Sequence, residues 1–305
     1  MQDNDTIQSS ASRIAVIIPV FNRMLITLNC LEQLTANERK NIDIVVVDDG
    51  SKDGTAEAIR IKYPAVHIVY GSGSWWYTRS VNEGLRYALK NTSCDYFLLL
   101  NNDIDLGYSY LDIVHGILDK YKNELTIFGS VSFNAENIIQ PVFLGIRKFI
   151  PWRNKQYCYS YSDYMAALHE GKEVLDSAFL PGRGMFFSKK TLLHNGLLDE
   201  GFPQYASDYE FSARSNTAGI KTRVCLHAIL YSHEKLTGAG SPKNKPGFYE
   251  FLSSLFNKYS PTYPINNYKL IRQHTGTPLL MPLSFLFVLS GKFKAYFKYK
   301  YLFLK

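Results

Sequence analysis

The chain has 305 residues, of which 46% are hydrophobic and 14% aromatic, and a formal net charge of +7 at pH 7. This composition excludes a globally disordered chain and fits one large domain, or one domain with an appendage. The positive charge lies in residues 243–305, which contain ten Lys or Arg and one acidic residue, so the near-neutral remainder does not indicate a nucleic-acid partner.

The four cysteines, Cys30, Cys94, Cys158 and Cys225, are far apart and form no CxxC pair. This spacing argues against a zinc knuckle or a disulfide framework and fits a reducing compartment. Residues 1–12 are polar and lack the basic and apolar regions of a signal peptide. No apolar run reaches the roughly 18–20 residues that span a bilayer. We therefore expect a cytoplasmic protein.

Apolar runs of strand length alternate with segments of helical periodicity from residue 13 to residue 133. Strands are expected at 13–20, 42–47, 66–70, 96–100 and 126–133, and helices at 24–35, 55–62, 81–89 and 110–121. This alternation predicts an α/β fold with a Rossmann-like, mostly parallel sheet, right-handed crossovers and helices on both faces.

The alternation fails after residue 134. Residues 134–178 show no clear period, and we expect an irregular insertion that shapes a pocket. Residues 178–188 resemble two short strands around a glycine-rich turn. A helix is expected at 208–217 and strand pieces at 222–232.

The expected strand at 96–100, YFLLL, is followed directly by Asn101, Asn102, Asp103 and Asp105. An apolar run of this length is typical of a strand buried on both faces, and the carboxyl ends of such strands bind ligands in open α/β sheets. Carboxylate and amide oxygens suit Mg²⁺ or Mn²⁺. A simple Asn/Asp-rich turn is the alternative.

Asp48 and Asp49 end the second expected strand, so we place them on the same rim as Asp103. An acidic pair there holds a ribose hydroxyl or a base edge, and Gly50 allows a ligand to approach the backbone. The alternative is a capped turn. The chain has no GxGxxG after the first strand and no phosphate-loop motif, which disfavours dinucleotide-binding and P-loop proteins.

Four stretches in order, VIIPVFNR, IVVVDDGSKDGT, LLLNNDIDL and YASDYEFSAR, resemble the nucleotide-sugar glycosyltransferases of family 2, which have a GT-A fold. The resemblance covers about residues 13–240. Within it, GSGSWWYTRSVNEGLRYAL (Gly71–Leu89) is similar to the GDGxLWWxxxxNxGLxYA segment of rhamnosyltransferase-like members. The resemblance implies an enzyme that binds a nucleoside-diphosphate sugar.

The resemblance also implies roles for individual residues. Those expected to contact the nucleotide or the sugar are Pro19, Phe21, Asn22, Asp48, Asp49, Trp76, Arg79, Asn82, Asn101, Asn102 and Arg183. Asn101 replaces the first Asp of the family's DxD motif, so Asp103 keeps the usual metal ligand and Asn101 offers only a neutral oxygen. Asp105 and His233 are further candidate metal ligands; for each, a structural or solvated position is the alternative.

Asp208 falls on the Asp of the family's ED motif, which acts as the catalytic base, and Ser207 replaces the preceding Glu. An inverting transfer needs one carboxylate to take the proton from the acceptor hydroxyl. It needs no acid on the leaving side, because a metal-bound diphosphate leaves already stabilised. Glu210 is the rival base, and a helix cap is the alternative role for Asp208.

The C-terminal segment KFKAYFKYKYLFLK (residues 292–305) interleaves lysines with aromatic residues and follows an apolar run at 279–289. This composition predicts a segment that lies on an anionic membrane surface, at the inner face of the cell membrane. A helical appendage packed on the domain, with snorkelling lysines, is the alternative. A lipid-linked acceptor would account for membrane contact.

These expectations define four parts of the chain: a disordered tail over 1–12, a nucleotide-binding half over 13–133, an acceptor or catalytic half over 134–242, and a basic aromatic helical appendage over 243–305. The expected activity is inverting, metal-dependent sugar transfer to a glycan or lipid-linked hydroxyl in cell-surface polysaccharide biosynthesis. A sugar-nucleotidyltransferase and a non-catalytic glycan-binding protein on the same fold remain the alternatives.

Overall fold

The structure is a computed structural model that describes residues 12–36, 41–233, 247–274 and 278–302. The expected disordered tail therefore lies outside the described residues, apart from Ser12. The last three residues of the basic C-terminal segment lie outside them as well.

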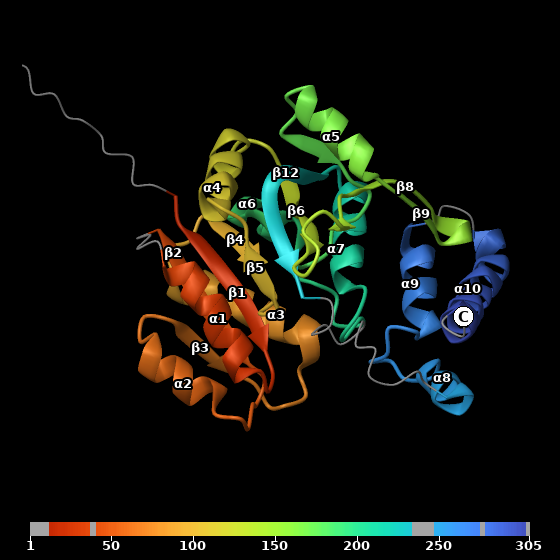
Figure 1. Ribbon diagram of the computed structural model, residues 1–305, viewed down its shortest axis with the longest axis horizontal. Helices are drawn as coiled ribbons and strands as arrows, with labels where there is room; N and C mark the ends of the chain where they lie inside the picture. Colours follow the sequence, from red (N-terminus) through yellow and green to blue (C-terminus); the bar gives the residue numbers. More distant parts are fainter. Residues whose placement is uncertain (1–11, 37–40, 234–246, 275–277, 303–305) are drawn as a thin grey trace, which may run out of the picture.

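A mixed sheet, ten-stranded within the described residues, forms the centre of the molecule (Figure 1). Its strands are β1 (Ile14–Val20), β2 (Ile42–Asp48), β3 (His67–Tyr70), β4 (Tyr96–Leu99), β5 (Ile104–Leu106), β6 (Thr126–Asn134), β7 (Pro141–Phe143), β10 (Val174–Asp176), β11 (Met185–Ser188) and β12 (Lys221–Ser232). The order is β10-β12-β6-β11-β4-β1-β2-β3, with β5 beside β12 and β7 beside β6.

The half of the sheet that contains β1, β2, β3 and β4 is parallel, as the alternation predicts. The other half is mixed, because β11 runs antiparallel to both β4 and β6 whereas β6 and β12 are parallel. Both faces of β1 are buried. Ile14, Val16 and Ile18 contact one apolar cluster, and Ala15 and Ile17 contact the other. A continuous apolar run is the pattern that such a strand requires.

Helices cover both faces of the sheet (Figure 1). On one face, buried side chains come from α1 (Met24–Thr35), α2 (Thr55–Lys62) and α4 (Tyr110–Lys120). On the other, they come from α3 (Trp76–Asn91), α5 (Tyr161–His169), α6 (Lys189–Asn195) and α7 (Ser207–Thr217). The four helices expected between residues 24 and 121 are therefore present, and the third begins five residues earlier than its periodicity indicates.

Residues 134–178 are more regular than the sequence indicates. This segment contains β7, a two-stranded sheet of β8 (Ile146–Ile150) and β9 (Lys155–Cys158), a 3₁₀ turn η1 (Pro151–Arg153), α5 and β10. The signal for α5 is local, because Ser160 and Asp163 form a capping box at its start. The expectation of an irregular insertion is therefore wrong.

Only one of the two strands expected at 178–188 forms, namely β11. Two residues before it donate backbone hydrogen bonds to side chains of α7. The backbone N–H of Leu180 donates to Ser212 Oγ at 3.1 Å, and that of Gly182 donates to a carboxylate oxygen of Asp208 at 2.8 Å. Side chains of a helix thus take the place of the missing strand partner.

The C-terminal residues form a helical appendage of α8 (Phe248–Ser254), α9 (Pro264–His274), a 3₁₀ turn η3 (Pro278–Leu280) and α10 (Met281–Leu302), which lies beyond α7 (Figure 1). Asn266 Nδ2 donates to the carbonyl of Tyr205 at 3.3 Å, and Lys269 Nζ donates to that of Gly201 at 3.1 Å. In the part of the chain that the structure describes, no helix is long and apolar enough to cross a membrane.

Candidate active site

A cavity of about 470 Å³ opens where β1 and β4 end. Nine of the residues that the sequence singles out line it: Pro19, Phe21, Asp49, Trp76, Asn101, Asn102, Asp103, Arg183 and Asp208. They come from the loops after β1, β2 and β4 and from α3, α7 and the segment before β11. This is the rim at which the carboxyl ends of parallel strands bind ligands.

Six other candidates are not among the residues that line this cavity: Asn22, Asp48, Arg79, Asn82, Asp105 and His233. The side chain of Asn82 is 1% exposed and bonded to the backbone of Leu198, as donor at 2.9 Å and acceptor at 3.0 Å. The guanidinium of Arg79 lies 5.2 Å from the ring centre of Trp75. Both side chains therefore hold neighbouring segments in place.

Asn22 and Asp48 organise the turn after β2. Asn22 donates its backbone N–H to Ser51 Oγ and accepts the N–H of Lys52 on its side-chain oxygen, both at 2.8 Å. The buried carboxylate of Asp48 accepts the N–H of Ser51 at 2.8 Å. These bonds hold the turn after β2 against the loop after β1.

Asp49 is engaged with the loop that leads into α3. Its carboxylate accepts backbone N–H groups of Gly73 and Trp75 at 2.8 Å and of Trp76 at 3.0 Å. Trp76 has a φ of 59°, a conformation that is costly for a residue with a side chain, and the bonds to Asp49 help to hold it. Asp49 therefore positions Trp76 at the cavity wall.

The ring of Trp76, 42% exposed, stacks on that of Tyr259 with centroids 4.1 Å apart and planes inclined by 14°. Tyr259 lies between α8 and α9, so the appendage contacts a wall of the cavity. Sequence reasoning missed Tyr259, because no local pattern links residues so far apart in the chain.

Asp103 is nearly buried and carries an ion pair that the sequence did not predict. Its Oδ2 lies 3.0 Å from Nη1 of Arg23, which also lines the cavity. Its other oxygen, Oδ1, is buried and accepts no hydrogen bond from the described residues. The available signal for Arg23 was its place directly after Asn22 in the VFNR stretch.

Asp105 and His233 bind each other instead of converging on Asp103. Asp105 Oδ2 lies 2.8 Å from His233 Nε2, and Asp105 Oδ1 accepts Gln33 Nε2 at 2.8 Å. Among the described residues, no three His, Cys, Asp or Glu side chains form a group able to hold a metal by themselves. The open Oδ1 of Asp103 nevertheless fits Mg²⁺ or Mn²⁺, which typically take one or two protein carboxylates and further oxygens from phosphate and water.

Asp208 lies in the first turn of α7 and is half-buried at the cavity wall. Its carboxylate accepts the N–H of Gly182 at 2.8 Å and that of Tyr209 at 2.9 Å. Burial raises the pKa of Asp208, and the two N–H groups and the nearby Arg183 partly offset this rise. A carboxylate with a raised pKa is a stronger base than a solvated one.

Ser207 and Glu210, which flank Asp208 in the YASDYEFSAR stretch, both have structural contacts. Ser207, which stands where the family has Glu, accepts a hydrogen bond from Thr78 Oγ1 at 2.8 Å and so joins α7 to α3. Glu210, the rival base, is buried in an ion pair with Arg214 at 2.9 Å and is not among the cavity residues. The geometry thus favours Asp208 over Glu210 as the base.

Two more polar side chains line the cavity close to Asp208. Burial and the negative charge of Asp208 raise the pKa of Tyr77, so its hydroxyl stays protonated and can donate a hydrogen bond. Arg183 pairs with Ser232 through Nη1, and its buried Nε has no partner among the described residues. Arg183 therefore keeps an unused donor next to a site that can accept an anion.

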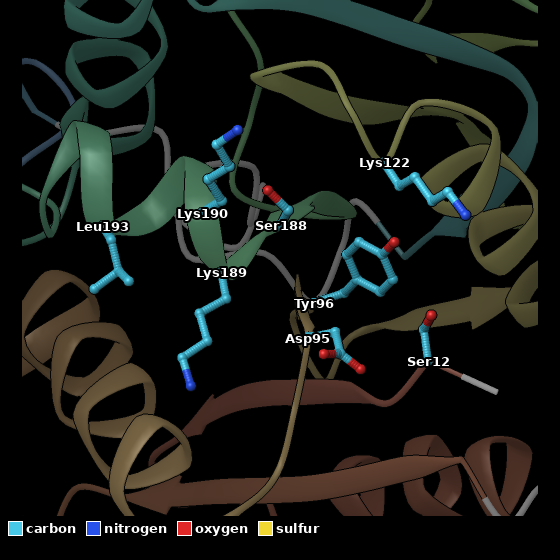
Figure 2. A pocket seen from close by; sticks show the side chains of 8 residues that line it. All are labelled: Ser12, Asp95, Tyr96, Lys122, Ser188, Lys189, Lys190 and Leu193. Carbon is cyan, nitrogen blue, oxygen red and sulfur yellow. The ribbon is translucent and has the colours of Figure 1, made fainter. Parts of the chain in front are cut away.

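A second hollow, of about 610 Å³, lies at the amino end of β4, and Figure 2 shows the residues that line it. They include Lys122, Lys189 and Lys190, whose amino groups point away from one another. We assign this hollow no ligand.

The sequence model of the family "Glycosyl transferase family 2" matches residues 15–154 of this chain. A curated relative, "Glycosyltransferase GlyA" of Streptococcus pneumoniae serotype 4, is 29% identical over 126 residues. That match covers 40% of this chain and 17% of the relative, so the chain spans only a small part of the relative's length.

Two solved structures have a similar fold. GalNAc-T7, solved with UDP, GalNAc and Mn²⁺, aligns with a TM-score of 0.59 and 16% identity over 78% of this chain and 45% of its own. The mannosyltransferase PcManGT from Pyrobaculum calidifontis, solved with GDP-Man and Mn²⁺, aligns with a TM-score of 0.57 and 15% identity. The alignment covers 94% of this chain and 74% of PcManGT. The expected GT-A fold is thereby confirmed.

Proposed function

We propose that the chain is an inverting glycosyltransferase that moves a sugar from a nucleoside-diphosphate sugar to a hydroxyl of a glycan or lipid-linked acceptor. The single observation that carries this proposal is the cavity at the carboxyl end of the sheet, which combines the unpartnered carboxylate oxygen of Asp103 with the half-buried carboxylate of Asp208. The family match over residues 15–154 and the sugar nucleotides named for the two solved structures support it.

In this proposal Asp208 accepts the proton of the acceptor hydroxyl while its oxygen attacks the anomeric carbon of the donor. The bond between that carbon and the diphosphate breaks, and its electron pair leaves with the diphosphate. Arg183 binds the diphosphate end, and Asp103 would hold Mg²⁺ or Mn²⁺ beside it. When bound, the cation supplies charge that stabilises the leaving group. Tyr77 donates a hydrogen bond near the base.

We further propose that Trp76, Phe21 and Asn101 line the donor site and that Asn102 supports it. The donor is dTDP-rhamnose or a UDP-hexose, on the strength of the rhamnosyltransferase-like stretch Gly71–Leu89. The product belongs to cell-surface polysaccharide biosynthesis at the cytoplasmic face of the cell membrane.

Membrane contact is assigned to the exposed side of α10. Leu283, Leu286 and Phe297 are 43%, 61% and 42% exposed, and the exposed Lys294 and Lys298 lie on the same stretch. Apolar side chains flanked by lysines favour a surface of anionic lipid. Co-sedimentation with anionic vesicles that is lost with neutral vesicles, and reduced by Leu286→Glu, would support this assignment. Equal binding to both vesicle types, or none, would contradict it.

The stereochemistry of turnover tests the proposal. The purified protein is given UDP-glucose, UDP-galactose, GDP-mannose or dTDP-rhamnose with Mn²⁺, and the first sugar anomer released into water is recorded by NMR. We expect the anomer opposite to that of the donor, and no release by Asp208→Asn. Release of the same anomer as in the donor would contradict single displacement by a base.

A further inference from the structure

The carboxylate of Asp103 has two unequal oxygens. Oδ2 lies 3.0 Å from Nη1 of Arg23, which stands at the junction of β1 and α1. Oδ1 is buried and has no hydrogen-bond partner in the described part of the chain. The side chain of Asp103 is 5% exposed and that of Arg23 is 31% exposed, so the arginine is the more accessible partner of this ion pair.

Arg23 is the cation paired with Asp103. Asn101 carries no charge, and the amide of Asn102 is turned to α1, where it donates to Thr27 Oγ1 at 2.9 Å. Asp105 is paired with His233 and is not among the cavity residues. The positive charge of Arg23 therefore balances the negative charge of Asp103.

A divalent cation meets an unfavourable environment at such a site. Mg²⁺ and Mn²⁺ give up water only for oxygen ligands that carry enough negative charge. Here a single carboxylate is offered, and a guanidinium already occupies one of its oxygens at hydrogen-bond distance. Because two like charges a few ångströms apart repel strongly near a protein surface, Arg23 lowers the affinity of Asp103 for a cation.

We propose that Arg23 is a resident counter-ion of Asp103, which keeps the affinity for a divalent cation low until a nucleoside diphosphate binds. The diphosphate then supplies oxygens and negative charge to both cations, the metal and the guanidinium. This inference rests on the proposed function in one respect, namely that Asp103 is the metal ligand. The ion pair between Arg23 and Asp103 then couples metal binding to nucleotide binding, so that each ligand raises the affinity for the other by the same factor.

The test measures binding of Mn²⁺ alone, without any sugar donor, by electron paramagnetic resonance of the free ion. Arg23→Gln removes the charge and keeps most of the length, whereas Arg23→Lys keeps the charge. Arg60→Gln serves as a matched control, because Arg60 is exposed on α2 and pairs with Glu57 at 3.4 Å. Melting curves confirm that each variant is folded.

We expect Arg23→Gln to bind Mn²⁺ about tenfold more tightly than the wild type, and Arg23→Lys and Arg60→Gln to match the wild type. Adding UDP, GDP or dTDP should strengthen Mn²⁺ binding by the wild type with at least one of the three. In Arg23→Gln, the factor by which the same nucleotide increases the Mn²⁺ affinity should be about tenfold smaller than in the wild type.

An unchanged Mn²⁺ affinity in Arg23→Gln would overturn the inference. So would a gain in affinity that persists when Asp103→Asn is added, because the new site would then not be Asp103. Failure of the proposed function would give a different result. A chain without sugar-donor turnover can still bind Mn²⁺ more tightly as Arg23→Gln, and it can still lose that gain when Asp103→Asn is added.

Discussion

The two ends of the central sheet both carry a hollow, and the two hollows differ in the charged groups that line them. At the amino end of β4, about 610 Å³ is lined by three lysines whose amino groups point apart (Figure 2). At the carboxyl end, about 470 Å³ brings Asp103 and Asp208 into one enclosure. Polar groups that converge in a hollow indicate a ligand site, whereas the volume of the hollow alone is a poor guide to function.

The difference has a physical origin in how each end holds its charges. At the carboxyl end the loops after β1, β2 and β4 meet α7 and the segment before β11. Backbone N–H groups hold carboxylates in place there, as those of Gly182 and Tyr209 do for Asp208. At the amino end Lys122 and Lys190 are exposed and Lys189 is half-buried. Charges that are desolvated and fixed in this way interact strongly with a ligand, whereas solvated ones are screened.

The largest expected effect is that of Asp208→Asn at the carboxyl end. Removing the base should lower turnover by about 10²- to 10⁴-fold, because no other group takes the proton. Donor binding should change by less than about threefold, since the side chain keeps its size. Turnover is followed by nucleoside diphosphate release and binding by titration calorimetry. Turnover close to that of the wild type would remove Asp208 from the chemistry.

Asp103→Asn should have the next largest effect, a loss of roughly 10²-fold in turnover at a fixed Mn²⁺ concentration. The reason is that an amide binds a divalent cation far more weakly than a carboxylate does. Raising Mn²⁺ should recover part of the loss, and a titration of rate against Mn²⁺ measures this. A rate independent of metal in both proteins would contradict the role of Asp103.

The dependence of kcat/KM on pH should show, without any mutation, that a carboxylate at the carboxyl end of the sheet acts as the base. Burial raises the pKa of Asp208, so the base becomes protonated and inactive at a pH above the usual range for Asp. The value of kcat/KM should therefore fall about tenfold per pH unit below that raised pKa. A profile that stays flat down to the ordinary pKa of a solvated Asp would contradict the burial-driven shift.

Tyr259→Ala should have a smaller effect, because it removes the stacking partner of Trp76 without touching the carboxylates. A stacked aromatic pair contributes about 0.5–1.5 kcal/mol, which corresponds to about a two- to thirteenfold rise in KM for the sugar donor or acceptor. Tyr259→Phe keeps the ring and should restore the wild-type KM. An equal effect of both substitutions would show that stacking is not the cause.

The smallest expected effect is at the amino end. Lys189→Ala combined with Lys190→Ala should change turnover by less than about twofold, because surface substitutions away from packed or charged features rarely matter. The same release assay measures it. A loss comparable to that of Asp103→Asn would mean that the comparison between the two ends is mistaken.

Sequence reasoning succeeded where the signal is local. The apolar run at 96–100 predicted a buried strand, and three of the four polar residues singled out after it, Asn101, Asn102 and Asp103, line the cavity. The helix that begins beside Asp208 was also predicted from its own residues. Placing Asp208 opposite Asp103 required the family resemblance, because periodicity contains no information about which loops meet.

The failures concern contacts between distant parts of the chain. Arg23 and Asp103 are 80 residues apart, and Asp49 binds N–H groups 24 to 27 residues later, so neither pairing leaves a trace in local composition. Asn82 was assigned to the ligand, yet its amide is bonded to Leu198. Such pairings depend on tertiary packing, which overrides the local preference of a residue.

The most direct test of the central claim is release of nucleoside diphosphate by the purified chain. The donors are UDP-glucose, UDP-galactose, GDP-mannose and dTDP-rhamnose, each with and without Mn²⁺ or Mg²⁺. The account predicts slow, metal-dependent release from one of these donors, which disappears in Asp208→Asn. No release from any donor, together with no thermal stabilisation by UDP, GDP or dTDP, would contradict it and favour a glycan-binding protein on a GT-A fold.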